Sequence, residues 1–217
     1  FIASQARGMS NATLQEEYTA NALVALLDKI GPAVLLTHSQ SGPHGWLAAD
    51  RRPDLVKALL VVEPNGPPFY SEDDQSIDRP HGITRLPLTF SPAITDPSQL
   101  TIAQQARPDA PDLFRCWLQT GKPRKLPTLA GIPILLVTGE ASFRAQYDHC
   151  TSKFLRQAGV ANEHVNLGDV GIHGNGHMMM LERNNLRIAA FMEKWLDRKV
   201  DRKRRWRHGG KEHHVHR

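Results

Sequence analysis

Apolar residues along the chain follow two spacings, and each spacing predicts a different element. Short, almost wholly apolar runs are typical of buried strands, and they occupy 33–37, 57–62, 132–137 and 164–167. Apolar positions three or four apart predict helices at 10–30, 43–51, 144–158 and 178–198, with Ser10 or Asn11 capping the first. Strands that alternate with helices predict a parallel α/β sheet with right-handed crossovers. Ligands of such sheets bind at the carboxyl ends of the strands.

Residues 64–131 interrupt this alternation. Twelve of the fifteen prolines lie between 64 and 133. A proline-rich stretch of this length is typical of a lid or a binding loop rather than of a core element. One short helix is predicted at 109–120, with an apolar face made of Leu113, Phe114, Trp117 and Leu118. We therefore expect one domain over 1–197 with a lid-like insertion at 64–131.

Charge separates the end of the chain from the rest. The net charge is +5, yet 198–217 holds nine Lys and Arg against two acidic residues, so the remainder is slightly acidic. We expect 198–217 to be a disordered, solvated basic tail, although such tails bind nucleic acid or anionic lipid in some proteins. The body is not expected to bind nucleic acid. Four tail histidines, at 208, 213, 214 and 216, lack a fixed geometry for a metal.

Composition excludes several classes of protein. Hydrophobic residues make up 40% and charged residues 23%, as in ordinary globular domains. No apolar stretch reaches the roughly 18–20 residues of a membrane span. Cys116 and Cys150 are the only cysteines, which excludes a disulfide scaffold and leaves their own pairing open. The chain begins at Phe1 and shows no signal peptide, so secreted and cytoplasmic locations both stay open.

The most informative segment is 37–42, Thr-His-Ser-Gln-Ser-Gly, where an apolar strand runs into Ser39 and a helix follows. A serine on such a strained strand-to-helix turn lifts its hydroxyl above the sheet, which is the geometry of a nucleophile elbow. The positions two before and two after come close together and need small side chains. Thr37 and Ser41 stand there, where glycine is usual. The backbone N–H of Gln40 would donate to a developing oxyanion.

A nucleophilic serine needs a base, and the base needs an acid that orients it. His173 and His177 follow the last predicted strand, where the order serine, acid, histidine places the base. His177 is favoured because it opens the last predicted helix. Glu63 and Glu140 each end a predicted strand and are the two candidate acids. Glu63 is favoured because a carboxylate that ends an apolar buried run is costly unless it is paired.

Three motifs together resemble a small group of α/β-hydrolase-fold serine esterases first described in bacteria. They are His-Ser-Gln-Ser-Gly at 38–42, Val-Glu-Pro at 62–64 and His-Gly-Asn-Gly-His-Met-Met-Met at 173–180, the last followed by Glu-Arg-Asn-Asn-Leu at 182–186. The resemblance covers most of 20–197 and is weakest across the insertion. In that group the acid is a glutamate after the strand that follows the nucleophile's helix. The resemblance therefore implies the α/β-hydrolase fold, with Ser39 as nucleophile, Glu63 as acid and His177 as base.

The resulting hypothesis is a serine hydrolase that cleaves small carboxylic esters through an acyl-enzyme intermediate, a mechanism that needs no metal or cofactor. This fold normally has strands before the nucleophile, and 1–32 contains no strand run. We therefore expect an N-terminally truncated sheet and an incomplete oxyanion hole. The alternative hypothesis is a catalytically impaired fragment that acts as a binding or interaction module. The aromatic residues of the insertion either line an acyl pocket or belong to the core: Phe69, Tyr70, Phe90, Phe114 and Trp117.

Overall fold

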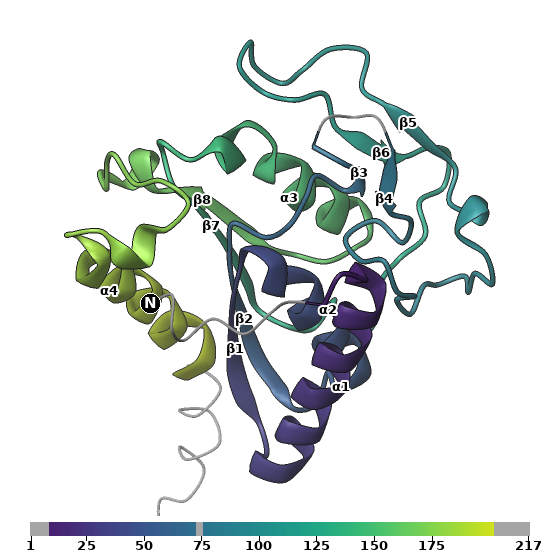
Figure 1. The fold of residues 1–217 in the computed structure, drawn as a ribbon, viewed down its shortest axis with the longest axis horizontal. Coiled ribbons are helices and arrows are strands. Elements are labelled where there is room, and N and C mark those ends of the chain that lie inside the picture. Colours follow the sequence, from purple (N-terminus) through teal and green to yellow (C-terminus); the bar gives the residue numbers. More distant parts are fainter. Residues whose placement is uncertain (1–8, 73–75, 202–217) are drawn as a thin grey trace, which may run out of the picture.

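A four-stranded sheet forms the centre of the computed structural model, which describes residues 9–72 and 76–201 (Figure 1). Its strands are β1 (Ala33–His38), β2 (Val56–Val62), β7 (Ile134–Thr138) and β8 (Glu163–Asn166). All are parallel and lie in the order β1-β2-β7-β8. The four predicted strands and the predicted α/β class are thus confirmed.

The register brings the carboxyl ends of the first three strands to one edge of the sheet. His38 at the end of β1 pairs with Val62, and Val62 pairs with Val137 on β7. The residues that follow these strands therefore emerge side by side, at the edge where α/β sheets bind their ligands.

The helices cover both faces of the sheet. They are α1 (Ala12–Ile30), α2 (Gly42–Arg51), α3 (Asp148–Gln157) and α4 (Asn185–Leu196). Asn11 caps α1 by accepting the Leu14 N–H at 3.0 Å, and Gly31 ends it with φ +80°, a conformation that favours glycine. Short 3₁₀ turns lie at Ser39–Ser41, Pro97–Gln99, Phe143–Gln146, Leu167–Val170 and Met179–Leu181.

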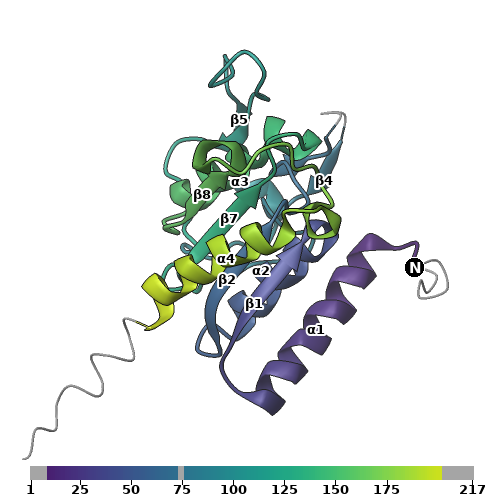
Figure 2. The same cartoon turned by 90° about the vertical axis from the view of Figure 1, so that its left-hand side faces the viewer.

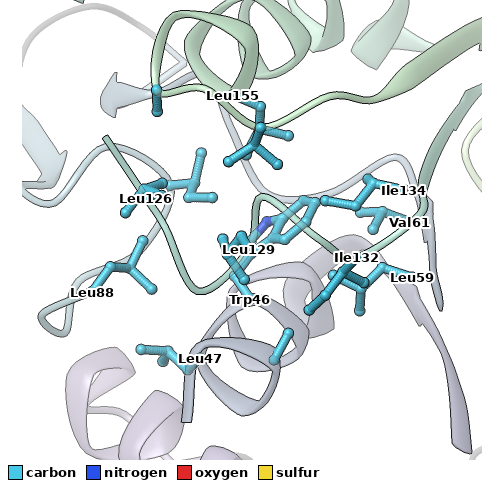
Figure 3. Packing of buried hydrophobic residues seen from close by; sticks show 14 of the residues in the cluster. Trp46, Leu47, Leu59, Val61, Leu88, Leu126, Leu129, Ile132, Ile134 and Leu155 are labelled. Atoms are coloured by element: carbon cyan, nitrogen blue, oxygen red, sulfur yellow. The ribbon is translucent and has the colours of Figure 1, made fainter. Parts of the chain in front are cut away.

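Two apolar clusters lie on opposite faces of the sheet. The larger joins α1, α2 and α3 to one face of β2 and β7 and to the insertion, with Trp46 from α2 and Leu155 from α3 among its members (Figure 3). The smaller packs α4 against the other face, through Ile188 and Trp195 (Figure 2). Strand residues alternate between these clusters, so both faces are buried, as the apolar runs predict.

The insertion forms two small antiparallel pairs instead of the predicted helix. β3 (Phe69–Tyr70) pairs with β4 (Ile77–Arg79), and β5 (Ile102–Gln104) pairs with β6 (Trp117–Gln119). The prediction of a helix at 109–120 is wrong. Pro111 interrupts that segment, and the backbone of 117–119 bonds to β5 instead. Cys116, just before β6, forms a disulfide with Cys150 of α3.

Other predicted boundaries shift by a few residues. The segment predicted as a helix from 144 contains a 3₁₀ turn before α3 begins at Asp148, because Ser142 caps that turn and Tyr147 leaves helical φ and ψ. The last helix begins at Asn185 rather than at 178. One π-helical turn, Asp197–Asp201, continues beyond α4, and Lys199 contacts Glu163 at 2.6 Å. The start of the predicted tail is therefore helical, and its remainder lies outside the described residues.

None of the described helices combines the length and the apolar character needed to cross a bilayer.

Candidate active site

Ser39 lies in a strained turn between β1 and α2. Its φ is +54°, a region that non-glycine residues rarely adopt. The Ser39 carbonyl accepts the Asn65 N–H at 2.9 Å. The Ser41 hydroxyl accepts the His38 N–H at 2.8 Å and donates to the His38 carbonyl at 2.7 Å. These bonds hold the turn on both sides of Ser39.

Glycines inside α2 supply the room that the turn needs. A Cβ on Gly45 would lie 2.6 Å from the Thr37 Cγ2, and a Cβ on Gly42 would lie 2.6 Å from the Pro64 Cβ. Thr37 therefore fits at a position where glycine is usual, because Gly45 opposite it has no side chain and leaves room for the Thr37 methyl group. The side chain that Thr37 adds to the turn at 37–41 is thus accommodated by a glycine one helical turn further along the chain, in α2.

His177 connects Ser39 to Glu63. Its Nε2 lies 2.9 Å from the Ser39 Oγ, and its Nδ1 lies 2.5 Å from the Glu63 Oε2. The three residues come from the loops after β1, β2 and β8. The structure thus brings together the serine, the favoured acid and the favoured base that the sequence indicated.

Glu63 is fully buried, at 0% exposure, and three donors meet its carboxylate. Besides His177, the Gly139 N–H donates to Oε1 at 2.7 Å and the Ser142 hydroxyl donates to Oε2 at 2.8 Å. A buried carboxylate without such partners would be strongly destabilising. Gly139 has to be small, since a Cβ there would lie 2.4 Å from the Asn175 carbonyl oxygen and 3.0 Å from the Glu63 Oε1.

The alternative acid and the alternative base contact each other. The Glu140 Oε1 lies 3.0 Å from the His173 Nδ1, and Oε2 accepts the Gly174 N–H at 2.9 Å. Both side chains are largely exposed. The Gly174 N–H, and then the His173 ring, hold the pKa of Glu140 below its usual value. This pair links the segment after β7 to the loop before His177, whereas Ser39 is contacted by His177.

His38 is a neighbour of the site that sequence reasoning missed. Its Nε2 lies 2.8 Å from the His177 carbonyl oxygen, and the two rings are 4.6 Å apart. Burial, as the largest cause, lowers the pKa of His38, which favours a neutral ring that donates through Nε2. The sequence feature that could have indicated its role is its position directly before Ser39.

Ser142 and Phe143 were also missed. Ser142 donates to Glu63, and the half-exposed Phe143 ring lies 5.0 Å from the His177 ring. Both lie in the segment after β7, which the sequence analysis considered only for Glu140.

Gln40, the predicted oxyanion donor, directly follows Ser39 in the 3₁₀ turn. Backbone N–H groups of a first helical turn have no acceptor within the helix. The Gln40 side chain donates to the Gln15 Oε1 at 2.9 Å, so it is held toward α1.

The aromatic residues of the insertion divide between the core and the wall of a cavity whose lining does not include Ser39, Glu63 or His177, so their role in an acyl pocket stays a prediction. Phe69 and Phe90 are buried in the larger cluster. Phe114 and Trp117 line a cavity of about 360 Å³ together with Pro67 and Leu113. Tyr70 stacks on Trp117 with 4.2 Å between ring centroids.

Two groups among the described residues bring three metal-ligating side chains together. One is His38, Glu63 and His177, which belongs to the site above. The other is Cys116, His149 and Cys150, at the disulfide.

Comparison with known proteins identifies the family. The model of the alpha/beta hydrolase family matches residues 3–191, so this chain belongs to that family. The parallel sheet with flanking helices is accordingly an α/β-hydrolase fold, as the sequence predicted.

One curated relative and one solved structure are informative. The relative, named "Probable secreted lipase phiG", from Fungal sp. (strain ATCC 74256), is 42% identical over 205 residues, 91% of this chain and 55% of the relative. The chain thus spans about half the length of that relative. The structure, described as "The Atomic Resolution Structure of a Novel Bacterial Esterase", has a TM-score of 0.52 and 24% identity, and the match covers 83% of this chain and 42% of that one. At this identity it supports the fold alone.

Proposed function

We propose that this chain carries the reacting residues of a carboxylic ester hydrolase, with Ser39 as nucleophile, His177 as base and Glu63 as acid. The observation that carries the proposal is the unbroken series of contacts from the Ser39 Oγ through the His177 ring to the Glu63 carboxylate, at 2.9 and 2.5 Å. Three residues this far apart in sequence meet with the separations that general base catalysis requires.

In the proposed reaction, the Ser39 Oγ attacks the ester carbonyl carbon while the His177 Nε2 takes its proton. The bond to the leaving alcohol then breaks, and His177 gives the proton to the alcohol oxygen. A water molecule, deprotonated by the same nitrogen, hydrolyses the acyl-serine and returns the enzyme. Glu63 accepts the Nδ1–H of His177, so that the lone pair of Nε2 faces Ser39.

The negative charge of the tetrahedral intermediate would develop beside the N-terminal end of α2. The Gln40 N–H is one proposed donor to this oxyanion, and the helix end favours the charge. A lost oxyanion donor costs about 10²–10³ in rate, so a chain with the Gln40 N–H as its one donor would turn over more slowly by that factor than a chain with two donors.

We further propose that the substrates are small carboxylic esters and that the chain is related to the bacterial-type esterases with a glutamate acid. The relative named as a lipase and the three motifs at 38–42, 62–64 and 173–180 support this class. The exposed Phe143 beside His177 offers an apolar surface for the group next to the scissile bond.

The test is covalent labelling with a fluorophosphonate, read by intact mass. We expect one adduct on the chain and none on Ser39→Ala, since only a serine activated by its base reacts rapidly with this reagent. Hydrolysis of p-nitrophenyl acetate should be lost in the same variant. A folded chain that takes up no label contradicts the proposal and favours the interaction module.

A matched pair of variants tests the assignment of the acid. Glu63→Gln should lower kcat by about 10²–10⁴ because it removes the group that fixes the His177 tautomer. Glu140→Gln should keep kcat within about twofold, as is usual for exposed sites away from the reacting groups. The reverse order of the two effects would assign the acid to Glu140.

A further inference from the structure

The disulfide joins the insertion to the body of the fold. Cys116 precedes β6 in the insertion and Cys150 lies in α3. Both side chains are fully buried, at 0% exposure. Its neighbouring polar side chain is His149 of α3, so the disulfide forms a centre apart from Ser39, Glu63 and His177.

One histidine faces both sulfur atoms. The His149 Nε2 lies 3.3 Å from the Cys116 Sγ and 3.5 Å from the Cys150 Sγ. The same nitrogen lies 3.7 Å from the Asp109 Oδ2. Asp109 belongs to the insertion, and its carboxylate also binds Lys153 of α3 through both oxygens, at 2.7 and 2.5 Å.

The two sulfur–nitrogen separations match those between neighbouring ligands of a tetrahedral zinc ion. With Zn–S bonds of about 2.3 Å and Zn–N bonds of about 2.0–2.1 Å, tetrahedral angles place sulfur and nitrogen ligands about 3.5 Å apart. Two thiolates and one imidazole are ligands that zinc accepts, and zinc sites with three protein ligands take water in the fourth position.

We propose that reduction of the Cys116–Cys150 disulfide turns this cluster into a Zn²⁺ site, with both sulfurs and the His149 Nε2 as its protein ligands and a water molecule as the fourth ligand. The two sulfurs have to move apart to non-bonded distance. Asp109, held by Lys153, lies 3.7 Å from the His149 Nε2 and places a negative charge beside the metal.

The chemistry balances with a phosphine as the reductant. The disulfide, the phosphine and one water give two thiols and one phosphine oxide, so the disulfide gains two electrons and two protons. Zn²⁺ then replaces the two thiol protons and forms two Zn–S bonds. The insertion stays attached to α3 in either state, first by a covalent bond and then by the metal.

The test compares the oxidised full chain with the full chain reduced by the phosphine, the reduction being verified by a mass increase of two hydrogen atoms. After dialysis against Zn²⁺ and a weak chelator, we expect the reduced form to hold one more zinc per chain than the oxidised form. The tail histidines are common to both forms, so the difference reports the cysteine site. Co²⁺ in place of Zn²⁺ should give the visible absorption of a tetrahedral site with thiolate ligands.

Variants distinguish zinc binding at this site from zinc binding by the two thiols alone. His149→Gln should weaken zinc binding by more than the 10- to 100-fold typical of losing an outer partner of a ligand. His173→Gln, which changes an exposed histidine elsewhere, should bind zinc like the parent. Equal zinc content in both redox forms overturns the proposal. So does a His149→Gln variant that binds as tightly as the parent, or a reduced chain that stays unfolded with zinc by circular dichroism.

Discussion

Ser39 and Glu63 share an uncommon backbone conformation. Among the described residues, three non-glycine residues have positive φ, and two of them are Ser39 at +54° and Glu63 at +44°. Such conformations cost on the order of 1–3 kcal/mol each and persist only where the surroundings impose them. Here the turn bonds around Ser39 and the three donors to Glu63 supply that constraint. The strain therefore supports a functional reading of these two positions.

His38 is expected to position His177 rather than to react. His38→Ala should lower kcat by about tenfold or more with KM little changed, because a shift of the base by a fraction of an ångström reduces proton transfer. His38→Gln, which keeps a donor for the His177 carbonyl, should recover part of the loss. Steady-state kinetics with p-nitrophenyl acetate and the rate of fluorophosphonate labelling measure both effects.

The outcome for His38 separates two roles. If both variants lose stability equally and keep the parent kcat, the bond to His177 only holds the loop, and the positioning role is wrong.

Elements buried on both faces were the most predictable part of the fold. The apolar runs gave all four sheet strands, and Asn11 and Gly31 marked the ends of α1. The prediction for 109–120 was wrong because the spacing of Leu113, Phe114 and Trp117 fits a helix as well as it fits the observed loop and strand. Its partners are β5 and Cys150, which lie elsewhere in the sequence.

The candidate site also has a part that could be predicted from the sequence and a part that could not. Ser39, Glu63 and His177 each follow a predicted strand, so topology alone brings them to one edge. The supports of Glu63, namely Gly139 and Ser142, and the contact of His38 with His177 depend on side-chain geometry. No spacing in the sequence encodes those contacts.

β8 is expected to lose stability in mild acid through His164. Burial lowers the pKa of His164 from 6.5 to about 4, and its Nε2 contacts the Thr138 hydroxyl at 3.0 Å. The unfolded chain binds the proton first, so the contribution of His164 is complete above pH 6.5 and is lost as the pH falls toward about 4. The free energy of unfolding should fall by up to about 1.4 kcal/mol per pH unit from this one group.

Urea unfolding at several pH values between 7 and 4.5 checks this expectation. The decline should be smaller in His164→Gln and unchanged in His173→Gln, whose parent residue is exposed. Parallel curves for the parent and His164→Gln would show that His164 titrates normally.

On the whole molecule, apolar side chains gather at the outer edge of β1. Within the described part of the chain, β1 pairs only with β2, and Leu36 is 58% exposed. Leu36 also lines an apolar groove of about 240 Å³ with Met180 and Met192. Leu186 of α4 is 80% exposed. An uncovered strand edge beside apolar surface favours association between chains.

We therefore expect the isolated 217-residue chain to aggregate with increasing concentration. Leu36→Lys should raise the concentration at which light scattering begins, because a charge on an edge strand opposes pairing. Tyr18→Lys changes an equally exposed residue, 57% accessible on helix α1, and serves as the control for added charge away from any strand edge. Equal protection by both variants would assign the effect to net charge instead of the edge.

The proposed base is the last of the three reacting residues to be synthesised. Ser39 precedes His177 by 138 positions and Glu63 precedes it by 114. At translation rates of about 5–20 residues per second, the serine leaves the ribosome on the order of ten seconds before the histidine does. During that interval the nascent chain carries an inert hydroxyl, so its reactivity toward esters would begin only when synthesis of the domain is almost complete.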